Sequence, residues 1–317
     1  MEKVFLTIQI SDELAGLRLD QALGIAFPEH SRSRLKGWIL IGQIIVNGQL
    51  KRPRDQVEAG DQIEIQAEIE SNTTWGSSDL PIEPVYEDDD LLVINKPANC
   101  VVHPAVGNRT GTLANALLHY CPALNHIPRA GIVHRLDKDT TGLMIVAKTL
   151  SAHTGLVALL QARQVKRLYE AVVQGRMVSG GTVDNPIGRH PKDRKRMAVV
   201  DSGKPAITHY RVMTRFAAHT HLSVQLETGR THQIRVHMAH IRHPVVGDKT
   251  YGNRNLPANI SELLRACLIA FPRQALHARS LALIHPITKK PMQWTISNPA
   301  DFQTLVNTLR SESGAID

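Results

Sequence analysis

The chain has 317 residues, of which 42% are hydrophobic and 21% charged, the composition of a globular protein with one or two domains. Aromatic residues make up only 4%, which argues against a protein that binds single strands by stacking many bases. Residues 131–317 hold 26 Lys/Arg and 12 Asp/Glu, a net of +14, within a total of +8. This concentration predicts a polyanionic partner, with a solvated basic surface as the alternative.

The sequence predicts a cytoplasmic protein that does not bind membranes. No stretch approaches the roughly 20 apolar residues that a membrane helix needs, and the first residues lack the pattern of a signal peptide. The three cysteines, Cys100, Cys121 and Cys267, form no CxxC pair, and their odd, sparse number fits a reducing cytosol.

The beginning of the chain predicts a strand and two helices. Residues 3–10 alternate between apolar and polar side chains, as a strand does. Residues 18–27 carry apolar side chains at helical spacing. Residues 31–40, SRSRLKGWIL, predict a second helix that Ser31 or Ser33 could cap.

A tight turn and a basic stripe follow these helices. Residues 44–50, IIVNGQL, predict a strand that enters a turn, because Asn47-Gly48 is a strong hairpin signal. A second turn leads into a strand that begins at Gln62. The basic stripe contains Arg32, Arg34, Lys36, Lys51, Arg52 and Arg54, with no acidic residue between them.

The remainder predicts a linker and a larger α+β domain. Residues 70–81, ESNTTWGSSDLP, have the composition of a linker. After them, strand-like and helical runs do not alternate one for one, so we expect a mixed, mainly antiparallel sheet flanked by helices. The strand-like runs are 91–94, 143–148, 208–213, 221–227 and 278–286, and the helical runs are 112–120 and 151–163. We place the domains at 1–72 and 83–317, with a linker at 73–82.

The most informative segment is RAGIVHRLDKDTTGLMIVAKT, residues 129–149. We expect an apolar strand that leads to Asp137, a turn up to Gly142, and a second strand. A carboxylate at the end of a strand, among basic neighbours, stays ionised and points into a cleft, as a carboxylate nucleophile must. The alternative is an Asp that caps the turn and pairs with Arg135, since Asp is common in turns.

Three further runs offer groups that bind anions or bases. Residues 226–248 include Arg230 and Arg235, and arginine clamps a carboxylate or phosphate through two parallel hydrogen bonds. Tyr169 lies in a strand-like run after a basic cluster; a core tyrosine is the alternative. Residues 188–199 form a basic loop typical either of phosphate contacts or of a solvated surface. Its basic residues are Arg189, Lys192, Arg194, Lys195 and Arg196.

A histidine series raises the question of a metal site. His237, His240 and His243 are three residues apart, so a helix would place neighbouring members on roughly one face. No HExxH motif and no Cys pair accompanies them, and a basic site repels cations. We therefore expect no metal.

Four motifs occur in the order and spacing of a known family. HRLDKDTTGL (134–143), NKP (95–97), RLYEA (167–171) and GRTHQIRVH (229–237) resemble the RluA-type family of pseudouridine synthases over essentially all of residues 80–300. HRLD followed by a Thr-Gly turn is a specific signature. The layout before them, with RLDQAL, SRSRLKGWI, VNG and GDQIEI, resembles the S4 RNA-binding domain, although each piece alone is weak.

The resemblance implies an enzyme that isomerises uridine in RNA without a cofactor. Asp137 matches the catalytic aspartate, which attacks C1′ of the sugar or C6 of the base, after which the base detaches, turns and rejoins through C5. Arg235 matches the basic residue that pairs with this aspartate. Tyr169 matches the tyrosine that stacks on the target base and is a candidate for the proton-transferring base. Arg135 matches the arginine that fills the space left by the flipped nucleotide.

The resemblance also implies how RNA is held. Phosphate contacts position an RNA without reading its sequence. The implied substrate is the large-subunit (23S) ribosomal RNA, specifically its helix 69 stem-loop, as free RNA or within the large ribosomal subunit, and we expect a monomer. The candidate RNA-binding residues are Arg135, Arg230 and Lys96, the stripe residues Arg32, Arg34 and Lys36, and the basic loop.

Two other functions stay open from the residues. A non-catalytic RNA-binding or ribosome-assembly factor would share the basic charge and the S4-like layout. It would not need an acid such as Asp137 at the centre of a basic surface, where a carboxylate weakens phosphate binding. A metal-dependent hydrolase built on the histidine series, with Asp137 and Asp139, would lose its activity in a chelator.

Overall fold

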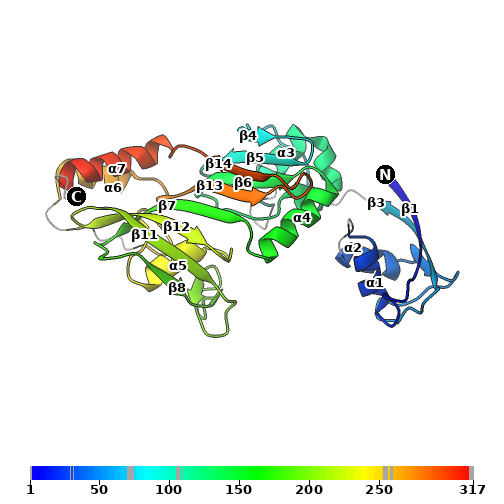
Figure 1. Ribbon diagram of the computed structural model, residues 1–317. Coiled ribbons are helices and arrows are strands. Elements are labelled where there is room, and N and C mark those ends of the chain that lie inside the picture. The colour runs from blue at the N-terminus through cyan, green and yellow to red at the C-terminus, as the bar shows by residue number, and fades with distance from the viewer. Residues whose placement is uncertain are drawn as a thin grey trace.

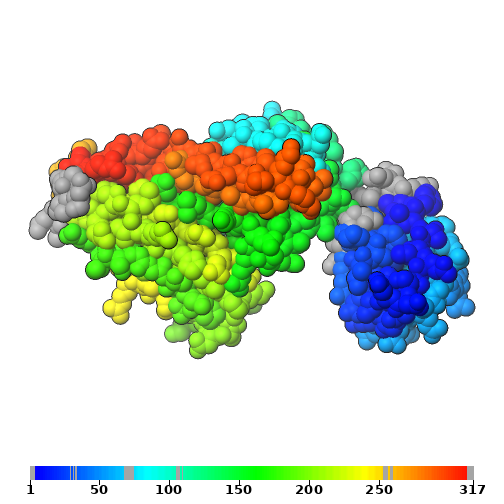
Figure 2. Space-filling view, in the orientation of Figure 1, coloured from blue at the N-terminus to red at the C-terminus, as the bar shows by residue number. Residues whose placement is uncertain are grey.

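The computed structural model describes residues 2–28, 30, 32–69, 75–104, 108, 110–252, 256–257 and 260–313. Ser31 and the side chain of Ser33, the two predicted helix caps, lie outside this part, as do residues 73–74 of the predicted linker. Two large hydrophobic cores that share no residue lie in the N-terminal part and in the rest of the chain. In the space-filling view, the N-terminal part forms a body of its own (Figure 2).

Three antiparallel strands and two helices make up the N-terminal unit. The strands β1 (Glu2–Gln9), β2 (Ile44–Val46) and β3 (Gln62–Ile69) pair in the order β1-β3-β2. The helices α1 (Leu19–Ala26) and α2 (Arg32–Leu40) bury their apolar faces in the same core. The strands and helices that the sequence predicts here are therefore confirmed.

The predicted Asn47-Gly48 turn is also present. Both residues have positive φ, 49° and 74°, as a type I′ turn requires. Val46 and Gln49 on either side exchange two backbone hydrogen bonds of 2.9 Å. The Asn47 amide donates to Asp61 at 2.7 Å, which ties the turn to the start of β3.

A nine-stranded sheet dominates the larger unit. Its order is β4-β5-β6-β13-β7-β12-β11-β8, with β14 paired to β13, and all its pairs are antiparallel except β13 with β6. This confirms the predicted mixed, mainly antiparallel sheet. The strands are β4 (Pro84–Glu87), β5 (Leu91–Lys96), β6 (Thr141–Ala147), β7 (Lys166–Gln174), β8 (Gly181–Asp184), β11 (Ile207–Arg215), β12 (His219–Leu226), β13 (Leu276–Ile284) and β14 (Pro291–Thr295). A separate hairpin consists of β9 (Ile187–Arg189) and β10 (Met197–Val199).

Helices lie on both faces of this sheet (Figure 1). Strand side chains alternate between faces, so Leu92 and Ile94 of β5 pack in the core that contains α3, while Leu91 and Val93 pack in the core that contains α4. The helices of the larger unit are α3 (Leu113–Tyr120), η1 (Pro122–His126), η2 (Pro128–Gly131), α4 (Leu150–Gln161), α5 (Gln233–His240), α6 (Glu262–Ala270) and α7 (Ala300–Ser313). None of the described helices is both long and apolar enough to cross a lipid bilayer.

The later part of the predicted linker packs on the larger unit. The Asn115 amide donates to the Gly76 carbonyl at 2.5 Å, and the Ser78 N–H donates to the Asn115 carbonyl at 3.1 Å. The Trp75 ring lies 5.7 Å from the His103 ring and contacts the main core. Residues 75–78 are therefore anchored to the larger unit.

The stretch before Asp137 is not the strand that the sequence predicted. Arg129 and Ala130 have positive φ values of 56° and 52°, which turn the backbone out of an extended course. Gly131 follows at φ 77°, and a Cβ at this position would overlap the Ala147 carbonyl at the end of β6. Residues 133–137 then run without regular structure. The course of the chain to Asp137 is thus set by close packing on β6.

Candidate active site

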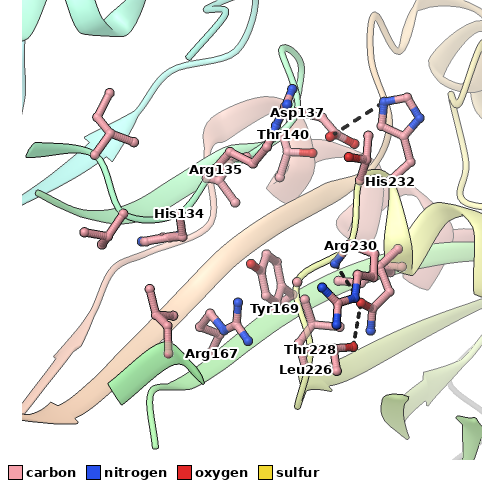
Figure 3. A pocket seen from close by; sticks show the side chains of 18 of the residues that line it. His134, Arg135, Asp137, Thr140, Arg167, Tyr169, Leu226, Thr228, Arg230 and His232 are labelled. Carbon is pink, nitrogen blue, oxygen red and sulfur yellow. Dashed lines mark hydrogen bonds and ion pairs between the residues drawn. The ribbon is translucent and has the colours of Figure 1, made fainter. Parts of the chain in front are cut away.

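A cavity of about 880 Å³ lies beside the irregular segment that ends at Asp137. Segments far apart in the sequence form its walls, and Figure 3 shows several of their side chains. The candidates Arg135, Asp137, Tyr169, Arg230 and Arg235 all line it. The structure therefore brings together the residues that the four motifs singled out, with the exception of the lysine of the NKP motif.

Arg235 holds Asp137 in place. Its Nη1 donates to Oδ2 of Asp137 at 2.8 Å, while Nε and Nη2 donate to the two oxygens of Asp248 at 2.6 and 2.8 Å. The side chain of Asp248 is 0% exposed and that of Asp137 is 14% exposed. Arg235 thus bridges a fully buried acid and an acid that faces the cavity.

The environment keeps Arg235 and Asp248 charged. Burial alone would lower the pKa of Arg235, but its hydrogen bonds to Asp248 and the charge of Asp137 raise the pKa above the usual value. Burial alone would raise the pKa of Asp248, but Arg235 and the N–H groups of Thr250 and Tyr251 hold the pKa below its usual value. A charged, bidentate pair fixes the guanidinium in one orientation.

Arg235, and not Arg135, is therefore the arginine that pairs with Asp137. Arg135 is exposed and lines the cavity. The Asp137 carboxylate accepts a hydrogen bond from Arg235 of α5 and lines the cavity. Its surroundings therefore differ from those of an acid that only caps a turn.

Tyr169 forms part of the cavity wall from β7. Its side chain is buried, with 5% exposed. Burial raises the pKa of its hydroxyl, Arg167 lowers it and Asp137 raises it, and the net result lies above the usual value. Tyr169 is therefore a neutral phenol at pH 7, and its ring offers a flat face to a planar ligand.

Glu170, the next residue of β7, lies in a buried polar network. His221 and Asn298 donate to its Oε2 at 3.0 and 2.6 Å, and Arg279 lies 3.2 Å from its Oε1. Burial alone would raise its pKa, but these hydrogen bonds and charges lower the pKa to about 2. The network fixes the strand that carries Tyr169.

We expect the Glu170→Gln substitution to reduce the acid sensitivity of the fold. The folded-state pKa of about 2 lies below the ordinary value of 4.5, so the carboxylate stabilises the fold above pH 4.5 and loses this effect as the pH falls towards 2. The difference in free energy of unfolding between wild type and variant should shrink over that interval, as urea titrations at several pH values would show. A constant difference would contradict this assignment.

Lys96 requires a correction, because it was expected to contact RNA. Its side chain is completely buried, and Nζ donates to the carbonyls of Pro97, Cys100 and Lys138 at 2.7, 3.0 and 3.0 Å. Burial lowers the pKa of this ammonium to about 8. Lys96 ties the loop after β5 to the residue that follows Asp137, so it supports the site from inside and does not face the cavity.

The other basic candidates lie on the surface. Arg230 lines the cavity, and its Nε donates to the Pro205 carbonyl at 3.1 Å. The β9–β10 hairpin carries Arg196, which is half-buried, and four exposed basic residues. These four are Arg189, Lys192, Arg194 and Lys195.

The basic stripe of the N-terminal unit is only partly available to a ligand. Arg32 donates to Asp20 at 2.9 Å, so its charge is shared with a buried acid. Arg34 is half-buried, and burial lowers the pKa of its guanidinium. Lys36 is exposed.

The histidine series is divided between different partners. His237 and His240 lie in α5, and His243 follows it. His237 Nδ1 lies 2.9 Å from Thr208 Oγ1, and His243 Nδ1 lies 2.8 Å from the Gln174 carbonyl. Within the described ranges, no group of three or more His, Cys, Asp or Glu residues could hold a metal ion.

Sequence reasoning missed three residues around Asp137. Asp248 anchors Arg235, His232 Nε2 lies 3.8 Å from Asp137 Oδ1, and the Tyr251 hydroxyl lies 2.8 Å from His232 Nδ1. Asp248 and Tyr251 stand in GDKTYG, directly after the arginine motif. The sequence offered one signal for Asp248 and Tyr251, which is that an acid and a tyrosine stand in one short run between two glycines.

Comparisons with known proteins identify the class of this chain as an RNA-modifying enzyme, a pseudouridine synthase. Residues 90–240 match the family described as RNA pseudouridylate synthase. The solved human protein "RNA Pseudouridylate Synthase Domain Containing 4" has 27% identity and a TM-score of 0.56, over 72% of this chain and 93% of that one.

Full-length relatives extend this likeness to the whole chain. The Pseudomonas aeruginosa protein named ribosomal large subunit pseudouridine synthase D is 58% identical over 97% of this chain and 96% of the relative. The Escherichia coli K12 protein of the same name is 53% identical over 98% of this chain and 96% of the relative. The chain therefore belongs to the RluA-type family and is an RNA pseudouridine synthase.

Proposed function

We propose that this enzyme isomerises uridine to pseudouridine in the large-subunit (23S) ribosomal RNA, in the helix 69 stem-loop. The observation that carries the proposal is the Asp137 carboxylate, held by Arg235 and open to the cavity. The ribosomal substrate is supported by the names of the relatives, whose likeness spans 97–98% of this chain and so includes the N-terminal unit.

In the proposed reaction, Asp137 attacks C1′ of the sugar or C6 of the base, and the N1–C1′ bond breaks. The base turns and a C5–C1′ bond forms. The bond between Asp137 and the nucleoside breaks, N1 takes up a proton, and the proton on C5 leaves for solvent. Nothing is oxidised and no outside group is added. Arg235 aims the carboxylate, and a fixed orientation of the nucleophile contributes strongly to rate.

Tyr169 is proposed to stack on the target base. Its raised pKa keeps the hydroxyl protonated, which favours this stacking role over that of the proton-transferring base. The target uridine must leave its stack to reach the cavity, and unstacking costs on the order of a few kcal/mol. We propose that Arg135, exposed beside the cavity, fills the vacated space and offsets part of this cost.

The N-terminal unit is proposed to be an S4-like RNA-binding domain that spans residues 1–72, before a linker at 73–82 and a catalytic domain at 83–317. Its Arg32, Arg34 and Lys36 would form a second anchor, and two tethered anchors raise the effective concentration of the RNA. We propose that the enzyme acts as a monomer in the cytoplasm, on free RNA or on the large subunit, and that Arg230 contacts the RNA at the cavity.

The β9–β10 hairpin is proposed to bind the RNA backbone. Replacing Lys192, Arg194 and Lys195 together with glutamine should flatten the plot of log affinity against log salt concentration by about 2 to 3, because each lost phosphate contact removes about 0.7 to 0.9 from the slope. Filter binding across salt concentrations measures this, with Lys290→Gln, an exposed lysine between β13 and β14, as the control. An unchanged slope in the triple variant would remove the hairpin from the RNA interface.

The substrate itself is tested with short transcripts. Wild-type enzyme should form pseudouridine in a helix 69 stem-loop and not in a stem-loop of equal length from another part of the same RNA, as chromatography of digested nucleosides would show. Equal modification of both would leave the enzyme class intact and refute the proposed site. If only the assembled large subunit is modified, the proposal of free RNA as a substrate fails.

A further inference from the structure

A chain of contacts runs from the β9–β10 hairpin to Asp137. The N–H of Met197, the first residue of β10, donates to the Tyr251 hydroxyl oxygen at 2.8 Å. That oxygen lies 2.8 Å from His232 Nδ1. His232 Nε2 lies 3.8 Å from Oδ1 of Asp137, the oxygen that Arg235 does not hold, as the dashed line in Figure 3 shows.

The hydrogen-bond partners of Tyr251 indicate which atoms carry the hydrogens in this series of contacts. Because the Tyr251 oxygen accepts from a backbone N–H, we infer that its own hydrogen is donated to His232 Nδ1, its other hydrogen-bond partner among the described residues. Nδ1 is then the acceptor, so the neutral ring carries its hydrogen on Nε2, towards Asp137. Burial lowers the pKa of His232, so the ring is neutral at pH 7 despite the charge of Asp137, which raises this pKa.

The backbone holds His232 in an uncommon conformation. Its φ is 58°, in the left-handed region, where few residues other than glycine occur. The next residue, Gln233, accepts hydrogen bonds from the Arg230 N–H at 2.9 Å and the Thr228 hydroxyl at 2.8 Å. Such a conformation persists where the surroundings enforce it, and it is common at functional sites.

The Tyr251 ring also contacts both the β9–β10 hairpin and the surroundings of Asp137. The Arg235 guanidinium lies 5.1 Å from the ring centroid, and that of Arg196, in the hairpin, lies 5.3 Å from it. Both distances lie in the range of cation–π contacts. Tyr251 therefore contacts the arginine that holds Asp137 and the hairpin, through its ring as well as its hydroxyl.

We propose that His232 is a positioning residue for Asp137, that Tyr251 sets its tautomer, and that this pair couples RNA contact at the hairpin to the reaction rate. The inference rests on the proposed roles of Asp137 and the hairpin. The present 3.8 Å is too long for a hydrogen bond, so a shift of about 1 Å at His232 completes it when RNA holds the hairpin. Each carboxylate oxygen then has one donor and keeps a lone pair for attack.

The test is a double-mutant cycle on single-turnover rate at saturating RNA. Tyr251→Phe keeps the ring and removes the hydroxyl, and it should slow the reaction about 10- to 100-fold with RNA affinity unchanged. His232→Ala should be slowed to a similar extent, and His232→Gln, which keeps an amide donor, should recover most of the rate. The double variant Tyr251→Phe/His232→Ala should be no slower than His232→Ala, because Tyr251 acts through His232.

The matched control is Tyr210→Phe, which removes the hydroxyl of a half-buried tyrosine in β11 and should retain the wild-type rate. A wild-type rate for Tyr251→Phe, losses that simply add in the double variant, or a loss confined to RNA affinity would each overturn the inference. If His232→Ala does not fold, Tyr251→Phe is compared in the His232→Gln background, where it should have no effect. Failure of the proposed function appears separately, as no pseudouridine formation by the wild-type enzyme, whereas full activity of Asp137→Asn would remove only the assigned nucleophile.

Discussion

The Asp137→Asn variant is expected to lose at least about 10⁴-fold in the rate of pseudouridine formation while it still binds RNA. An amide has neither the charge nor the nucleophilicity of a carboxylate, yet it has nearly the same shape. The Asn oxygen still accepts from Arg235, and the pair of Arg235 with Asp248 is untouched, so the fold should be retained. Chromatography of nucleosides after digestion of a single-turnover reaction measures the loss.

Asp139→Asn is the matched control, because Asp139 lies two residues further along the same turn and does not line the cavity. Its rate should stay within a few-fold of wild type. Equal losses in both variants, together with inhibition by a chelator, would instead indicate that both carboxylates hold a metal ion. Full activity of Asp137→Asn would show that another group is the nucleophile.

Arg235→Met should remove activity and destabilise the fold at the same time. The substitution leaves Asp248, which is 0% exposed, as a buried carboxylate without its cation. Breaking a buried pair on one side costs about 3 to 5 kcal/mol of unfolding free energy. Arg235→Lys keeps a charge but cannot donate two parallel bonds to Asp248 and a third to Asp137, so we expect about 10²-fold lower activity.

A second substitution separates the two effects of Arg235. Arg235→Met/Asp248→Leu removes both buried charges, so it should recover much of the stability lost in Arg235→Met without recovering activity. Urea unfolding gives the stability, and the single-turnover rate gives the activity. Wild-type stability of Arg235→Met, or restored activity in the double variant, would contradict the bridging role of this arginine.

The central strands of the large sheet and the helices α1 to α4 followed from local patterns. Strand-like runs located β1 and, in the large sheet, β5, β6, β7, β11, β12 and β13, but not β4, β8 or β14, and Asn47-Gly48 located its turn. The approach to Asp137 did not follow, because Arg129 and Ala130 take left-handed conformations that their side chains do not favour. Packing on β6 imposes these conformations, and this packing is not encoded in the local pattern.

The residues of the site were predictable where they stand in a motif. The contacts between residues that are distant in the sequence were not. The pairing of Asp137 with Arg235 joins residues 98 positions apart, and only the family resemblance pointed to it. Lys96 was placed on the wrong side of the site, because charge alone does not show that three backbone carbonyls enclose an ammonium group. Asp248, His232 and Tyr251 gain their roles only through contacts made in the folded chain.

The most direct measurement is tritium release from unmodified large-subunit ribosomal RNA that carries tritium at C5 of uridine, with EDTA present. Formation of the C5–C1′ bond frees this tritium to water. We predict release by the wild-type enzyme and none above background by Asp137→Asn. No release by the wild type from this RNA, either free or within the large subunit, despite tight binding, would contradict the proposed function and favour a binding or ribosome-assembly role.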